Sequence, residues 1–126
     1  MQTIKSFRDL LVWQKSMDLA VRCYRIAQRL PKQDQIVLGY QIRKSSVSLP
    51  SNVAEGFSRH STAHYIQHLW TAHGSGGELE TQLELGHRLD FFDARETELL
   101  LGDAQEVGKM INGLVRSLDR TGPYRT

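Results

Sequence analysis

Apolar residues recur at intervals of three and four along most of the chain, in four segments separated by short polar connections. This spacing places apolar side chains on one face of a helix, whereas the faces of a β-strand alternate at every second residue. The pattern predicts an all-α fold: an antiparallel, up-down four-helix bundle in a single domain, residues 1–126. The expected helices cover approximately residues 9–30, 34–57, 62–89 and 94–118.

Prolines and capping residues indicate where these helices begin and end. Pro31 should stop the first helix, Asp34 can cap the second, and Asp93 can cap the fourth. Pro50 falls inside the second segment, where it removes one backbone hydrogen bond. The apolar stripes keep their phase across it, so we expect a helix kinked at Pro50 rather than a break with Asn52 capping a new start.

The first two helices each carry two apolar stripes, one more than a monomeric bundle needs. In the first helix one stripe is Val12, Leu19, Cys23, Ile26 and Leu30, and the other is Leu10, Trp13, Met17, Ala20, Tyr24 and Ala27. In the second helix they are Leu38, Ile42, Leu49 and Val53, and Ile36, Tyr40, Val47, Ala54 and Phe57. The additional stripes suggest packing against another subunit.

Charge is distributed unevenly along the chain. Residues 1–60 hold ten Lys and Arg against four Asp and Glu, whereas residues 61–126 hold six against ten. The asymmetry fits either a half that binds polyanions or two halves that pair with each other, within one chain or between subunits. Because Lys and Arg neutralise phosphates, the candidate nucleic-acid-binding residues form a basic ridge: Lys15, Arg22, Arg25, Arg29, Lys32, Arg43 and Lys44.

Catalytic and metal-binding patterns are incomplete. His60, His64 and His68 share a helix face without a nearby carboxylate or cysteine, and Glu84-x-x-His87 lacks the second such motif that a di-iron bundle needs. The glycine-rich segment 74–77 has no preceding strand and is not a phosphate loop. We expect close approach of another helix there, or else a local break. We therefore expect no enzyme activity, no cofactor and no metal, and a buried packing role for the single cysteine, Cys23.

The N-terminal segment lacks the apolar run of a signal peptide, and no stretch approaches the ~20 apolar residues of a membrane span. We therefore expect a soluble, cytoplasmic protein with no membrane partner.

Four segments together form a recognisable pattern: residues 7–15, 41–57, 72–83 and 112–118. They resemble the bacterial four-helix-bundle family first named for proteins encoded in intervening sequences of 23S ribosomal RNA genes. The accessory variability proteins of diversity-generating retroelements belong to the same group. The most specific stretch is Ser48-x-Pro-Ser-Asn-x-Ala-Glu-Gly56.

The resemblance implies a ring-shaped homopentamer that binds RNA or DNA, and a reverse transcriptase or another RNA-handling protein, without catalysis of its own. It also implies structural roles, as a kink, close helix contacts and buried polar anchors, for Pro50, Asn52, Ala54, Glu55, Gly56, Glu78, Leu79 and Glu80. The chain departs from the family pattern at His68, where the family often has an aromatic residue, and at Gly76, where it usually has a large apolar one.

Overall fold

Four long helices make up most of the chain in the computed structural model, which describes residues 3–121 and the side chains as far as Asp119. All regular structure in that range is helical, which confirms the predicted fold class. The long helices are α1 (Leu11–Gln28), α3 (Tyr40–Phe57), α4 (Thr62–Arg88) and α5 (Ala94–Thr121). Shorter elements are the 3-10 turn η1 (Phe7–Asp9), α2 (Lys32–Asp34) and the π-helical turn η2 (Gln35–Gly39).

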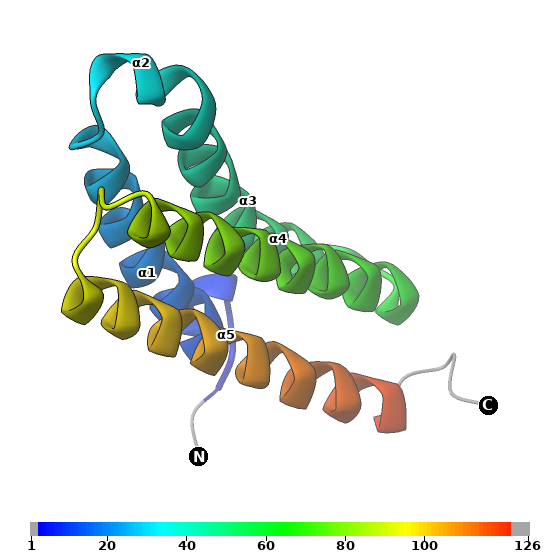
Figure 1. Ribbon diagram of the computed structural model, residues 1–126. Helices are drawn as coiled ribbons and strands as arrows, with labels where there is room; N and C mark the ends of the chain where they lie inside the picture. Colours follow the sequence, from blue (N-terminus) through cyan, green and yellow to red (C-terminus); the bar gives the residue numbers. More distant parts are fainter. Residues whose placement is uncertain (1–2, 122–126) are drawn as a thin grey trace.

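The four long helices form a ring in which each has two neighbours (Figure 1). Helix α1 packs against α3 and α5, and α4 packs against α3 and α5 on the other side. Short connections make sequential helices antiparallel, as expected for an up-down bundle. The outer face shared by α1 and α3 therefore lies opposite the outer face shared by α4 and α5.

The corner between α1 and α3 differs from the expectation. The second helical segment begins at Lys32, and Asp34 lies inside its first turn without a side-chain capping bond, so the predicted cap was wrong. Pro31 precedes that turn, and it can do so because the first N–H groups of a helix have no intrahelical partner. The Gln35 side chain stabilises the corner by donating to the carbonyls of Ala27 and Leu30, at 2.8 and 2.9 Å.

Two further predictions concern residues that break helices. Helix α3 passes through Pro50 without a break, as the phase of its stripes predicts. Helix α4 is also continuous through the glycine segment 74–77, so the alternative of a local break was wrong, and no other helix among the described residues of this chain comes close to Gly74 or Gly77. A Cβ atom placed on Gly74 or Gly77 would meet no atom within 4 Å beyond the helix backbone, and one on Gly76 would lie 3.9 Å from Leu49.

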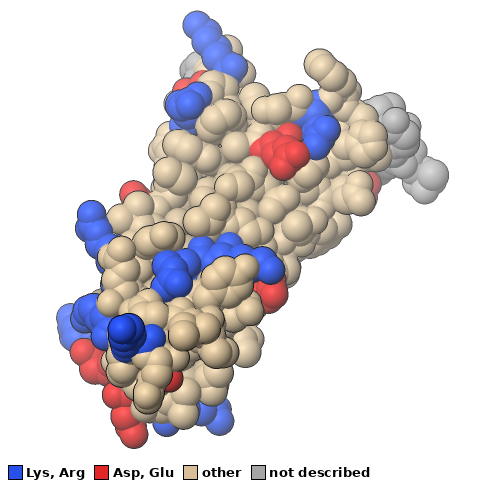
Figure 2. All heavy atoms as spheres, turned by 90° about the horizontal axis from the view of Figure 1, so that it is seen from above, with Lys and Arg blue, Asp and Glu red and all other residues tan. Residues whose placement is uncertain are grey.

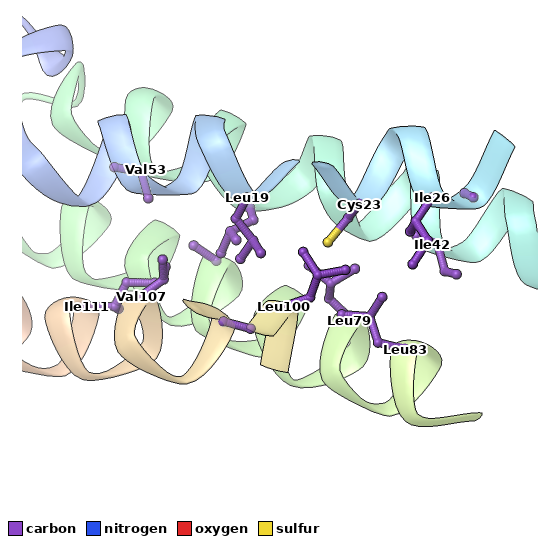
Figure 3. Packing of buried hydrophobic residues seen from close by; sticks show 14 of the residues in the cluster. Leu19, Cys23, Ile26, Ile42, Val53, Leu79, Leu83, Leu100, Val107 and Ile111 are labelled. Atoms are coloured by element: carbon purple, nitrogen blue, oxygen red, sulfur yellow. The ribbon is translucent and has the colours of Figure 1, made fainter. Parts of the chain in front are cut away.

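One core runs between the four long helices, and each of them contributes to it (Figure 3). Leu19, Ile42, Leu79 and Ile111 come from four different helices and are all 0% exposed. Asp93 caps α5 as predicted, its carboxylate accepting from the Glu96 N–H at 2.8 Å. This helix continues to Thr121, past the predicted end at residue 118; Gly122 and Pro123 lie outside the described residues.

Cys23 lies in this core, and burial raises the pKa of its thiol to about 12. Because the thiolate is the reactive form, we expect Cys23 in the folded protein to resist alkylation by iodoacetamide at pH 8. Unfolding in urea should expose the thiol and restore the reactivity of a free cysteine. Mass spectrometry after timed labelling measures both rates, and rapid labelling without urea would contradict the buried position.

Candidate interaction surfaces

The basic ridge predicted on the first helix is partly neutralised by α5. Lys15 Nζ lies 2.6 Å from Glu106 Oε1, and Arg22 Nη2 lies 2.5 Å from Asp103 Oδ2. A third ion pair joins Arg29 to Glu96. The three cations are seven residues apart, and this heptad spacing keeps them on the side of α1 that faces α5. We call these three pairs the ion-pair ladder.

The uneven charge distribution fitted either a half that binds polyanions or two halves that pair with each other. For these three cations the structure shows pairing with the acidic half of the same chain. The hydrogen bond to Glu106 raises the pKa of Lys15 and so favours its charged form. All six side chains remain at least 36% exposed. Exposed pairs of this kind contribute little to stability, because solvent and salt screen the charges.

Replacing Arg22 with alanine should therefore change the free energy of unfolding by less than about 1 kcal/mol, because its ion pair is exposed. Arg25→Ala is the matched comparison, since Arg25 makes no ion pair with any described residue. Urea unfolding of the two variants measures the difference. A loss of more than about 2 kcal/mol for Arg22 alone would show that the ladder is a major stabilising element.

The structure places six of the seven predicted cations on two separate faces, and the seventh, Lys32, begins α2. Arg22, Arg25 and Arg29 line a hollow of about 370 Å³ between α1 and α5, together with the exposed Leu99. Arg43 and Lys44 lie instead on the outer side of α1 and α3. Within residues 3–119, Arg25, Lys32 and Lys44 have no acidic partner, whereas the Arg43 guanidinium donates to the side chain and the carbonyl of Gln35.

The second apolar stripe of each of the first two helices is exposed only in part, since Leu10 and Trp13 pack against the core and Ala27 is buried. Tyr24, Tyr40 and Val47 are 40%, 50% and 53% exposed, whereas the first stripes are buried in the core. Tyr24, Tyr40, Val47, Arg43 and Lys44 line a shallow hollow of about 350 Å³. We define the α1/α3 face as Met17, Val21, Tyr24, Tyr40, Arg43, Lys44 and Val47.

Figure 2 shows the side of the molecule that is uppermost in Figure 1. Many Lys and Arg side chains lie in the lower left part of this view. Acidic side chains lie both at the edge of the molecule and beside Lys or Arg side chains in its upper part. Much of the remaining surface in this view is uncharged. The sequence predicted the cations and the apolar stripes separately. It did not show that Tyr24 and Tyr40 share a hollow with Arg43 and Lys44, because that depends on how α1 and α3 pack.

Asn52 links α3 to α4 through its side-chain amide. Its side-chain nitrogen donates to the Ser48 carbonyl at 2.9 Å, and its oxygen lies 3.1 Å from Nδ1 of His68. Arg59 donates to Nε2 of His68 at 3.3 Å, so Nε2 is the acceptor and Nδ1 carries the hydrogen that bonds to Asn52. His68, a departure from the family pattern, thus takes part in the contact between α3 and α4.

Gly56 supplies a close helix contact in the same region. A Cβ atom at this position would lie 2.9 Å from Cβ of His68 and 3.2 Å from the carbonyl oxygen of Tyr65. Neither atom belongs to the flexible end of a side chain, so the position requires glycine if α3 and α4 are to keep this separation.

The other signature residues divide into core and surface positions. Leu79 and Pro50 are buried, and Ala54 is half-buried. The expectation of buried anchors was wrong for Glu55 and Glu78, which are exposed. Glu55 accepts a hydrogen bond from Arg59 at 2.7 Å, one helical turn away, and Glu80 is half-buried between α4 and α5.

The histidine patterns do not converge on a metal site in the part of the chain that the structure describes. No group of three or more His, Cys, Asp or Glu side chains is arranged to hold a metal ion among those residues. His68 has both ring nitrogens in hydrogen bonds, and Nδ1 of His87 lies 2.8 Å from the Phe92 carbonyl. Glu84 pairs with Arg88.

Within residues 3–121, no helix is both long enough and apolar enough to cross a membrane.

Residues 8–113 match the family model described as 23S rRNA-intervening sequence protein. The chain belongs to this family. The match covers all four long helices through most of α5 and confirms the resemblance drawn from the sequence. The kinship with retroelement accessory proteins stays a prediction.

A solved structure shows the same fold. It is a protein of unknown function from the S23 ribosomal protein family of Bacteroides thetaiotaomicron VPI-5482, with 28% sequence identity and a TM-score of 0.79. The similarity covers 83% of this chain and 98% of that one. No curated protein matches the chain.

Proposed function

We propose that this protein is a non-catalytic scaffold that associates with copies of itself through the α1/α3 face and binds nucleic acid through the basic side of α1. The observation that carries the proposal is the exposed second stripe. Tyr24, Tyr40 and Val47 form a contiguous apolar surface that the bundle itself does not need. Surfaces of this kind, edged by polar residues, mark sites of protein association.

Nucleic-acid binding follows from the other cations. Arg25 and Lys32 lack acidic partners among the described residues, and Arg22 and Arg29 can exchange exposed carboxylates for phosphates. In a single copy, carboxylates of α5 already pair with Lys15, Arg22 and Arg29, so the ridge should bind a polyanion only weakly. Several ridges on one particle bind the same strand together, and their combined affinity greatly exceeds that of one ridge. Assembly and nucleic-acid binding are therefore coupled in this proposal.

The family resemblance extends the proposal to a cytoplasmic ring of five copies, with a reverse transcriptase or another RNA-handling protein as its protein partner. The alternative is an assembled protein-interaction module without nucleic-acid binding. Both functions use the exposed apolar residues of the α1/α3 face. They differ only in whether the basic ridge binds nucleic acid.

Light scattering, combined with titration of single- and double-stranded RNA and DNA at two salt concentrations, tests the proposal. The wild type should form a particle heavier than one 14.4 kDa chain and bind nucleic acid with an affinity that falls steeply with salt. Val47→Glu should be monomeric and bind on the order of tenfold more weakly or worse, because avidity is lost.

The matched control separates charge from assembly. Arg25→Ala combined with Lys32→Ala should keep the mass of the wild-type particle and lose binding. An assembled wild type that binds no nucleic acid at low salt would establish the alternative module. A wild type that stays monomeric at all concentrations would contradict the scaffold itself.

A further inference from the structure

A groove follows the seam between α4 and α5, opposite the α1/α3 face. It consists of two adjoining hollows, of about 530 and 170 Å³, which share Gly77 and Glu80 in their linings. The wider hollow is also lined by Thr81, Glu84, Leu85, Arg88, Leu101 and Gln105. We call this the α4/α5 groove.

The groove exists partly because side chains are missing from α4. Gly74 and Gly77 lie on its exposed side, where a Cβ atom would meet nothing within 4 Å. A glycine within a helix costs about 1 kcal/mol relative to alanine. Packing inside the chain gives no reason for these two glycines. Close approach of a helix from outside does, because a surface without Cβ atoms lets another helix come near.

The groove and the α1/α3 face carry opposite unpaired charges, and each exposes an apolar side chain. Glu80 in the groove has no ion-pair partner among the described residues, and neither has Lys44 on the opposite face. Leu85 is 48% exposed at the groove, as Val47 is 53% exposed on the face. Lys44 could therefore pair with Glu80 of another copy, and the exposed apolar side chains of the two surfaces could bury each other.

We propose that the α1/α3 face of one copy docks into the α4/α5 groove of the next, with α3 as the inserted helix. This inference rests on the self-association proposed above and adds the surface that receives it. Lys44 meets Glu80 of the partner subunit, and Val47 packs over the glycines. A symmetric contact between two α1/α3 faces would instead bring Arg43 and Lys44 close to their own copies, and like charges repel.

The contact is head-to-tail, so each copy has one inserting face and one receiving groove. Such contacts repeat until a ring closes, or continue as an open stack. Two variants can each disable one partner surface while leaving the other intact. Val47→Glu disables the inserting face. Gly77→Leu places a larger side chain in the groove, at a position where its Cβ atom meets no other part of its own chain within 4 Å.

The test is to mix these two variants. Each alone should be monomeric, and together they should form a complex of one copy of each chain and stop there, because one intact contact remains. Gly102→Leu is the matched control. Gly102 is another exposed helical glycine with no atom within 4 Å of its Cβ position, but it does not line the groove, so this variant should assemble like the wild type. Light scattering measures all four masses.

The charge pair gives a second readout. Lys44→Glu and Glu80→Lys should each weaken association on the order of tenfold, and the double variant should recover most of the loss.

The possible failures are distinguishable. If Val47→Glu is monomeric but Gly77→Leu assembles like the wild type, the groove is not the receiving surface, while the scaffold proposal stands. If both variants are monomeric but do not combine, the contact is not head-to-tail between these surfaces. If the wild type is monomeric, both proposals are overturned.

Discussion

Gly56→Val is expected to lower the free energy of unfolding by about 3 kcal/mol, the upper part of the usual range for overpacked interiors. The new side chain would overlap Cβ of His68 and the backbone of Tyr65. Neither atom can rotate away, so relief requires α4 to move from α3. That movement would stretch the hydrogen bond between Asn52 and His68, so packing and polar contacts are lost together.

Gly102→Val provides the control for this substitution. Both glycines lie in helices, but a Cβ atom at Gly102 meets nothing within 4 Å, so the same chemical change should be neutral within about 1 kcal/mol. Urea unfolding monitored by circular dichroism measures both variants, at one protein concentration because association adds to stability. Equal stability of the two variants would show that α3 and α4 do not approach closely at Gly56.

Leu79→Ala is the second large expected effect. Leu79 is 0% exposed at the centre of the core, where side chains from all four long helices meet. Removing it deletes apolar contacts and leaves a cavity that a close-packed bundle fills only partly. The expected loss is about 2–5 kcal/mol in the free energy of unfolding.

The same substitution at Leu99 serves as its reference. Leu99 is 57% exposed on α5, so Leu99→Ala should cost less than about 1 kcal/mol. Thermal unfolding of the two variants should separate them by many degrees, since a small domain shifts by roughly 4–8 °C per kcal/mol. Similar unfolding temperatures would contradict the central position of Leu79.

The fold was predictable because it depends on local periodicity. Stripes at intervals of three and four residues indicate the buried face of each helix, and their phase across Pro50 indicates that α3 is continuous. The start of the second helical segment was mistaken because capping residues are a weaker signal. Asp34 has the right chemistry for a cap, but the segment begins two residues earlier, at Lys32, and Pro31 occupies the N-cap position.

The candidate surfaces were predictable only in part, because partners across the bundle are not encoded in local spacing. The sequence shows a row of cations on the first helix, but only the packing of α1 against α5 reveals that Arg22 faces Asp103. The sequence shows the second apolar stripe, but not which of its residues are exposed. Its combination with Arg43 and Lys44 required the position of α3.

The glycines also show what the sequence does not reveal about packing. Judged by helix propensity alone, Gly56, Gly74 and Gly77 are equally unfavourable. The structure shows that Gly56 is required by a neighbouring helix, whereas the other two face open space. Whether a position requires glycine depends on the atoms of the neighbouring helix, such as those of His68 and Tyr65 beside Gly56. The sequence alone does not show these contacts.

The ion-pair ladder also bears on how the bundle opens. It joins α1 to α5, and its partners are 67 to 91 residues apart, so this seam closes the longest loops among the ion pairs of the described residues. Ordering a long loop carries an entropic cost, and salt screens exposed charges while leaving apolar contacts in place. Dissolved ions therefore weaken the seam between α1 and α5 before the seams that lack such pairs. Amide hydrogens of α5 should exchange with solvent faster as ionic strength rises, while those of α3 and α4 stay protected.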